Sequence, residues 1–205
     1  MNTASNNTRE KARPTIVIAG AGYGGLAAAR RLSRYAGKLR VVVVDQNHYH
    51  LLQFQLHEVA VGKIDAAALA VPLRRLLPKN VEFRQATIRS FDFDRKRVRT
   101  SSGDVRYDHL IIALGGQQAT FDIPGLNEHA FTLKSLRDAL RINGHIESTL
   151  AAASHLTDPS TQEGALTFAI GGAGITGVEL AAELQKSSAI ARASTVLIRA
   201  VSASF

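Results

Sequence analysis

The chain has 205 residues, a formal net charge of +8 and no cysteine, and its 45% hydrophobic and 20% charged residues are typical of a globular protein with a buried core. The lack of cysteine excludes disulfides, zinc–thiolate sites and a redox dithiol, so electron transfer by this chain requires a bound cofactor. Aromatic residues are not interleaved with the positive charges, which predicts a solvated basic face and no nucleic-acid groove.

The first thirteen residues are polar and precede Pro14, so we expect a disordered tail over 1–13. This segment lacks the apolar centre of a secretory signal. Nowhere does an apolar run reach the roughly 18 residues of a membrane helix. The sequence therefore predicts a cytoplasmic protein.

A strand, a glycine turn and a helix come next. The β-branched run "TIVIAG" from Thr15 is typical of a strand buried on both faces. Helical spacing follows in "YGGLAAARRLSRYAG", with Gly37 as the expected stop, and "LRVVVVDQ" reads as a second buried strand. Together they predict a right-handed, parallel βαβ unit.

The middle of the chain is more varied. Residues 65–79, "DAAALAVPLRRLLPK", read as a helix interrupted near Pro72 and Pro78. The next segments, "VEFRQATIRSFDFD", "KRVRTSS" and "VRYDHLIIAL", alternate apolar and polar residues and predict a small antiparallel meander, with "HLIIAL" as a buried strand. We then expect a helix from Leu133 to about Ser154 and a polar spacer, "HLTDPSTQEG".

A second strand–turn–helix unit begins after this spacer. It comprises a strand over 165–170, a helix over 175–186 and a candidate strand in "STVLIRA". The chain thus carries two copies of the same supersecondary pattern.

The first glycine run, "GAGYGG", is a GxGxxG motif between a strand and a helix. Gly20 permits the tight turn, Gly22 lets a pyrophosphate approach the backbone, and Gly25 lets the helix pack on the strand. Asp45 ends the second strand twenty residues after Gly25, where a carboxylate can bind a ribose hydroxyl. The pattern predicts a dinucleotide site that includes Gly24; a turn that serves packing alone is the alternative.

The second run offers Gly172, Gly174 and Gly177 in the same roles. Two such sites imply two dinucleotides, and without cysteine the economical pairing is FAD at the first and a nicotinamide dinucleotide at the second, exchanging a hydride. The alternative is a duplicated packing device without a ligand. Arg199 stands where the NADH ribose carboxylate is expected, which fits either the 2′-phosphate of NADPH or a frameshifted, truncated copy.

The chain resembles the two-dinucleotide flavoprotein reductases, most closely the type II NADH dehydrogenases, in the order of "IVIAGAGYGGLAAA", "VVVVDQNHYHLL", "YDHLIIALGG", "FDIPGL", "TLKSLRDALRI" and "IGGAGITGVELAAEL". The resemblance implies an α/β, Rossmann-like FAD/NAD(P)-binding fold with an incomplete second Rossmann domain. It implies the first segment of an FAD-binding domain over 14–130 and the start of a truncated NADH-binding domain over 131–205.

The family's cofactors and partners follow from this resemblance. It implies FAD, NADH and a quinone acceptor, peripheral association with the inner face of the cell membrane, and leaves room for a homodimer. A non-catalytic dinucleotide-binding remnant, and a related reductase with a ferredoxin-type or sulfide partner, are the alternatives.

The resemblance also implies roles for single residues. Ala113 and Gly115 match a strand-end turn over the flavin, with Leu114 where the family usually has threonine. Glu179 matches the catalytic carboxylate beside the nicotinamide; alternatively, Glu179 and Glu183 form one solvated stripe on a helix.

Three histidines cluster in "NHYHLLQFQLHE". A His-x-His pair can serve a metal or a proton relay, but no third ligand stands at a fixed spacing, so we read His48, His50 and His57 as loop residues. The resemblance implies that this loop lines the flavin pocket, with Gln53 or Gln55 nearby.

Overall fold

The computed structural model describes residues 13–119, 123–172, 174–186 and 195–199, the last of these by their backbone alone. The chain divides into two compact units. The first unit comprises the residues up to His50 together with Pro72–Gly115, and the second comprises Leu51–Val71 together with the residues from Gly116 onward. The tail predicted over 1–13 lies, apart from Arg13, outside the described residues.

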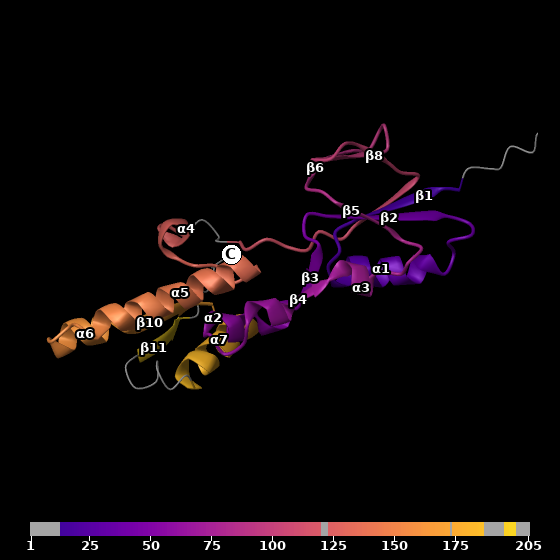
Figure 1. The fold of residues 1–205 in the computed structure, drawn as a ribbon. Coiled ribbons are helices and arrows are strands. Elements are labelled where there is room, and N and C mark those ends of the chain that lie inside the picture. Colours follow the sequence, from indigo (N-terminus) through magenta and orange to yellow (C-terminus); the bar gives the residue numbers. More distant parts are fainter. Residues whose placement is uncertain (1–12, 120–122, 173, 187–194, 200–205) are drawn as a thin grey trace, which may run out of the picture. The chain divides into compact units, whose positions relative to one another are not determined.

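A parallel sheet of four strands forms the centre of the first unit (Figure 1). In spatial order its strands are β5 (Glu82–Gln85), β2 (Arg40–Asp45), β1 (Thr15–Ala19) and β9 (His109–Ile112). Helix α1 (Tyr23–Ser33) connects the parallel neighbours β1 and β2, which confirms the predicted βαβ unit. The helix ends before the expected stop at Gly37, because the chain turns at Arg34 to reach β2.

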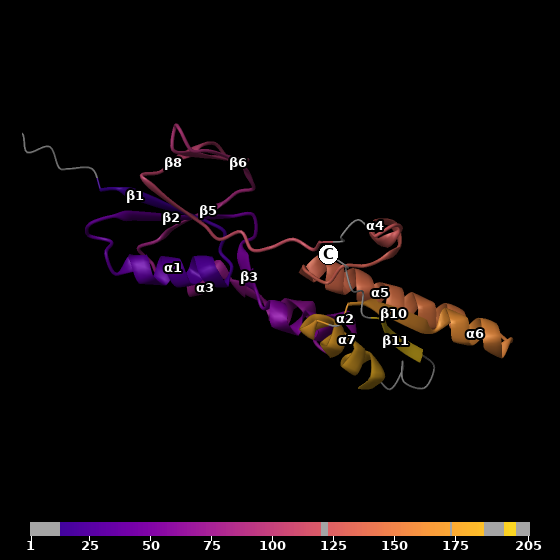
Figure 2. The ribbon, with the colours of Figure 1, turned by 180° about the vertical axis from the view of Figure 1, so that it is seen from behind.

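The side chains of β1 and β2 alternate between two cores, as strand geometry requires. Ile18 and Val43 pack with Leu26 of α1 and Leu73 on one face of the sheet. Val17, Val42 and Val44 pack against the meander on the other face, where Val98 and Tyr107 are buried. The covering elements, seen from both sides in Figures 1 and 2, are α1 and α3 (Leu73–Leu76) on one face and β6 (Ile88–Asp92), β7 (Arg97–Thr100) and β8 (Val105–Arg106) on the other.

Three predicted elements differ from the structure. The segment over 65–79 is not one helix but a 3-10 turn η2 (Ala66–Leu69), strand β4 (Ala70–Pro72) and α3, because Pro72 forces extended backbone before it. Strand β4 pairs with β3 (Tyr49–Leu51), where the chain passes between the units.

The first part of the predicted meander, β5, is a parallel strand beside β2. It alternates like a meander strand because it lies at an edge of the sheet and is only half buried. Strand β9 was expected to be buried, yet Ile112 is exposed, because among the described residues no strand pairs with the outer edge of β9.

The second unit packs helices around a short parallel strand pair. The pair β10 (Thr167–Gly171) and β11 (Thr195–Arg199) is connected through α7 (Ile175–Lys186), so the second predicted strand–helix–strand unit is confirmed. Leu56, Val59 and Ala139 form one core, and Ile146 and Leu184 form another. Besides η2, the unit contains η1 (Gln53–Gln55), α2 (Leu56–Ala60), α4 (Leu126–His129), α5 (Leu136–Ala153) and α6 (Pro159–Ala165).

Helix caps explain two boundaries here. Helix α5 begins three residues later than predicted because Ser135 and Asp138 form a reciprocal capping box. The predicted polar spacer contains α6, whose Asp158 accepts a hydrogen bond from the Thr161 amide and precedes Pro159 at the first helical position. These two residues are a helix-start signal that a reading of polarity alone overlooks.

The two units are defined by how the chain packs. The predicted boundary between residues 130 and 131 separates an FAD-binding part from an NADH-binding part, and this division by cofactor stays a prediction. Within the described residues, every helix is too short or too polar to cross a bilayer.

Candidate functional site

The first glycine turn lies between β1 and α1, and two of its glycines are sterically required. Gly20 has φ +101°, and a Cβ there would lie 2.3 Å from the carbonyl oxygen of Ala113. A Cβ on Gly25 would lie 1.9 Å from the carbonyl oxygen of Gly20. Both distances are far inside van der Waals contact, so the turn, the start of α1 and the end of β9 fit together only with glycine at these positions.

Gly22 faces open space. A Cβ built on it meets no atom within 4 Å, and its backbone, at φ −69° and ψ −169°, is one that any residue adopts. Gly22 caps α1 without a side-chain hydrogen bond, and the first turn of the helix has no acidic residue. The helix therefore offers amides without a side-chain cap and a positive dipole end that no acidic residue of the first turn compensates, which is the arrangement that anions favour.

Asp45 stands at the end of β2 beside this turn. Its Oδ2 accepts a hydrogen bond from the Ala21 amide at 2.7 Å, and its Oδ1 accepts one from the Asn47 amide at 2.8 Å. Each carboxylate oxygen has a further lone pair, so the group can hold the turn and still accept a ribose hydroxyl.

Ala113 and Gly115 follow β9. The Ala113 amide donates to the carbonyl of Ala19 at 2.8 Å, which places the Ala113 carbonyl over Gly20. Gly115 has φ +79°, a conformation that favours glycine, and Leu114 between them is 55% exposed. The structure brings Ala113 to the glycine turn, while the flavin role of Gly115 stays a prediction.

His50 departs from the sequence-based interpretation. It lies in strand β3, is 6% exposed, and its Nδ1 is 3.2 Å from the carbonyl oxygen of Ala21. Its ring meets the Tyr23 ring edge-on, with 4.5 Å between centroids. The interpretation as a loop histidine is wrong for His50, because its partner Ala21 lies far away in the sequence.

The other two histidines have different surroundings. His48 is in the loop before β3, as expected, and its exposed ring stands edge-on to Tyr49. His57 lies on α2 and not in a loop. Gln53 and Gln55 lie on η1. Among the described residues, no group of three histidine, aspartate or glutamate side chains is placed to hold a metal ion.

The second glycine turn repeats the helix-on-strand packing of the first, although Gly172, unlike Gly20, has no atom within 4 Å of a Cβ. A Cβ on Gly177 would lie 2.6 Å from the carbonyl oxygen of Gly172, which has φ +100°. The same Cβ would lie 3.4 Å from Ile170 Cγ2, as a Cβ on Gly25 would lie 3.5 Å from Ile18 Cγ2. The helix therefore packs on the strand in the same way in both copies.

Gly174 corresponds to Gly22. It too has no atom within 4 Å of a Cβ, and the first turn of α7 has no acidic residue. The backbone of Arg199 pairs with Gly171 in β11, while its side chain lies outside the described part of the chain, so the NADPH alternative stays a prediction.

Glu179 and Glu183 project from α7 to different partners. Glu179 Oε2 is 3.5 Å from His57 Nδ1, and the glutamate side chain is 43% exposed. Glu183 is 11% exposed and pairs with Lys63 at 3.2 Å and Lys186 at 3.3 Å. The hydrogen bond from Lys63 lowers the pKa of Glu183 most. A single solvated stripe is therefore wrong for Glu183, which holds α7 to the segment after α2.

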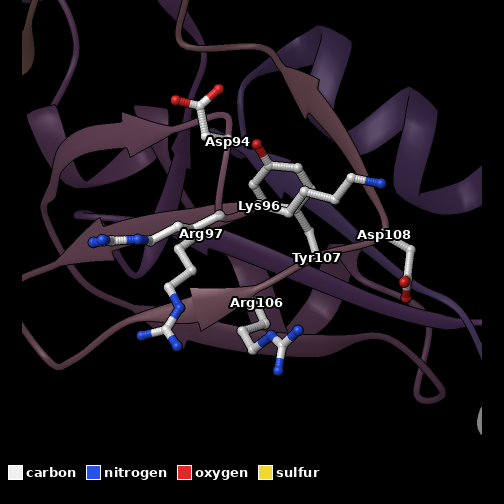
Figure 3. Close-up of a pocket in the computed structure, with 7 residues that line it drawn as sticks. Asp94, Lys96, Arg97, Arg106, Tyr107 and Asp108 are labelled. Carbon is white, nitrogen blue, oxygen red and sulfur yellow. The ribbon is translucent and has the colours of Figure 1, made fainter.

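A pocket of about 400 Å³ lies on the meander of the first unit (Figure 3). Tyr107 is among the residues that line it, and the side chains of Lys96 and Arg106 extend in different directions. The pocket contains none of the predicted site residues and is separate from the glycine turn. Its lining residues are Asp94, Arg95, Lys96, Arg97, Arg106, Tyr107 and Asp108.

Comparisons with known proteins match a stretch of this chain that includes both glycine turns. The model of the pyridine nucleotide-disulphide oxidoreductase family matches residues 14–204. The chain is 32% identical over 175 residues to the type II NADH:quinone oxidoreductase of Staphylococcus aureus, which covers 84% of this chain and 43% of the relative. The Staphylococcus epidermidis protein of the same name is 33% identical over the same shares. The chain thus spans less than half the length of these relatives.

Solved structures share the fold. NDH2 from Plasmodium falciparum, in complex with NADH, has a TM-score of 0.77 at 23% identity and covers 91% of this chain and 41% of that protein. The sulfide:quinone oxidoreductase of Aquifex aeolicus has a TM-score of 0.71 at 25% identity, over 90% of this chain and 43% of that one. The predicted Rossmann-like α/β fold is confirmed.

Proposed function

This chain belongs to the pyridine nucleotide-disulphide oxidoreductase family, and we propose that it binds FAD at its first glycine turn and NADH at its second. In this proposal it forms the dinucleotide-binding part of an NADH:quinone oxidoreductase. The observation that carries it is the repeated geometry of the two turns. In each, a Cβ on the last glycine (Gly25 or Gly177) would collide with the carbonyl oxygen of the first, and a Cβ on the middle glycine (Gly22 or Gly174) meets no atom within 4 Å.

At the first site the chain supplies binding and orientation. The open face of Gly22 and the uncapped amides of α1 receive the diphosphate of FAD, and Asp45 accepts a hydrogen bond from its ribose. When bound, FAD supplies the two-electron chemistry that a chain without cysteine lacks.

At the second site Gly172, Gly174 and Gly177 form the corresponding turn for NADH. Glu179 lies on α7 two residues after Gly177, and its carboxylate, which is 43% exposed beside His57, borders the nicotinamide. A negative charge there stabilises the positive charge that the nicotinamide ring gains as its hydride leaves.

The quinone acceptor rests on the relatives of 32% and 33% identity, which are named type II NADH:quinone oxidoreductases. Quinones with long apolar tails dissolve in bilayers, so the proposal implies peripheral contact with the cytoplasmic face of the membrane. The net charge of +8 favours an anionic lipid surface.

The purified chain tests the proposal through its visible spectrum. We expect a yellow protein that keeps FAD on dialysis and is bleached by NADH without oxygen. Gly22→Ala should raise the Kd for FAD at least about a hundredfold without lowering the thermal midpoint, because the added Cβ meets only ligand. Gly174→Ala should affect NADH in the same way.

Gly37→Ala is the matched control, because its Cβ also meets nothing within 4 Å and Gly37 lies outside both turns. It should keep both affinities. A colourless wild-type protein that takes up no added FAD would instead identify a chain without this activity.

A further inference from the structure

Ala21, in the middle of the first glycine turn, is held from both sides. Its amide donates to Asp45 Oδ2 at 2.7 Å, and its carbonyl oxygen is 3.2 Å from His50 Nδ1. Ala21 itself is 2% exposed, so water cannot replace either partner. The two side chains come from β2 and β3, so the turn is held against both strands.

The chemistry of the contact defines the protonation of His50. A carbonyl oxygen only accepts hydrogen bonds, so the imidazole must donate and Nδ1 must carry a proton. The ring is buried, and the ring of Tyr23, the first residue of α1, meets it edge-on. Losing the donor would leave a buried carbonyl unsatisfied, which is costly.

The direction of one peptide group connects this contact to the open face of the turn. The Ala21 carbonyl and the Gly22 amide belong to the same peptide plane, and in a trans peptide they point in opposite directions. The described residues contain no cis peptide bond. With the carbonyl held towards His50, the Gly22 amide points away from it.

We propose that His50 is a positioning residue for FAD, which aims the Gly22 amide at the diphosphate by holding the Ala21 carbonyl. This inference rests on the proposed function, because it assumes that the first turn receives FAD. This role differs from the metal site and the proton relay that a His-x-His pair can serve.

Two substitutions distinguish the hydrogen bond that His50 donates from the space that its ring fills. In His50→Asn the side-chain amide nitrogen takes the place of Nδ1 and still donates, whereas His50→Leu fills the space without a donor. We expect His50→Leu to raise the Kd for FAD about tenfold and His50→Asn to stay within about threefold of the wild type. His109→Leu, an exposed histidine at the far end of β9, should leave the Kd unchanged.

NADH binding at the second turn is the internal control. His50→Leu should leave the Kd for NADH unchanged, and equal losses for both dinucleotides would overturn positioning in favour of general misfolding. Equal FAD affinities of wild type and His50→Leu would also overturn it, as would failure of His50→Asn to restore binding. Wild-type protein that binds no FAD would instead refute the proposed function.

The ligand-free chain provides a second measurement. Long-range proton–nitrogen NMR of the histidine rings should show a protonated Nδ1 at His50. The signals assigned to this ring should be absent from the spectrum of His50→Leu. A neutral ring protonated only at Nε2 would overturn the inference, whatever the chain binds.

Discussion

Neighbouring glycines of the first turn have different physical reasons to be glycine. A Cβ on Gly20 or Gly25 would collide with a carbonyl oxygen, whereas a Cβ on Gly22 would meet no atom within 4 Å. A Cβ on Gly24 would lie 3.9 Å from the Cβ of Ala113, which is an ordinary contact. Packing therefore requires glycine at the first two positions, whereas at Gly22 only the proposed ligand does. A motif written as letters does not separate these requirements.

Gly25→Ala should lower the free energy of unfolding of the ligand-free first unit by about 3 kcal/mol, since the backbone oxygen at 1.9 Å cannot move aside. The adjacent Gly24→Ala should raise it by about 0.5 kcal/mol, because alanine favours the helix and meets no clash. Urea titrations followed by circular dichroism measure both. Similar values for the two variants would contradict the packing described for the turn.

Glu179→Gln should slow the anaerobic reduction of bound flavin by NADH about tenfold, which corresponds to ~1.4 kcal/mol in the barrier, while FAD stays bound. The amide keeps the size of the side chain and removes its charge. Stopped-flow absorbance measures the rate, and Glu147→Gln on the exposed face of α5 is the control. An unchanged rate in Glu179→Gln would remove this residue from the site.

At the scale of elements, local signals predicted more than remote ones did. Strands β1, β2 and β10 and helices α1 and α7 follow from β-branched runs, glycine turns and helical spacing, all contained within each segment. The parallel pairing of β5 depends on β2, and the burial of His50 depends on Ala21, so neither is visible locally. The same holds for the contact of His57 with Glu179.

Helix α6 offers a test of its cap by pH. Hydrogen bonds from Thr161 and Ser160 lower the pKa of Asp158 from 3.8 to about 2. The cap therefore stabilises α6 fully above about pH 4 and is lost as the pH falls through about 2. The Thr161 amide shift in NMR should titrate with that low midpoint and become independent of pH in Asp158→Asn. A midpoint near 3.8 would contradict the cap.

At the scale of the whole molecule, each unit carries one glycine turn: the first unit contains Gly20 to Gly25, and the second contains Gly172 to Gly177. Each unit also has its own buried cores. Ligands that bind separate units stabilise them separately.

Hydrogen exchange should therefore distinguish the two cofactors. FAD at a hundred times its Kd should add about 2.7 kcal/mol to the stability of the first unit and slow exchange in β1, β2 and β9 about a hundredfold. NADH should instead protect β10 and α7. Mass spectrometry of peptic fragments measures both, and equal protection of the two units by FAD would contradict separate sites.

The position of β9 in the sheet also governs how the chain is made. Strand β1 can pair with its second neighbour, β9, only after the segment around Asp108 has been synthesised. The Asp108 carboxylate accepts a hydrogen bond from the Thr15 amide, 93 residues away in the sequence. At about 5–20 residues per second, a ribosome needs roughly 5–20 s to synthesise that interval. During that time an apolar strand edge stays exposed on the nascent chain, so the yield of folded protein should depend on chaperones that bind such edges during translation.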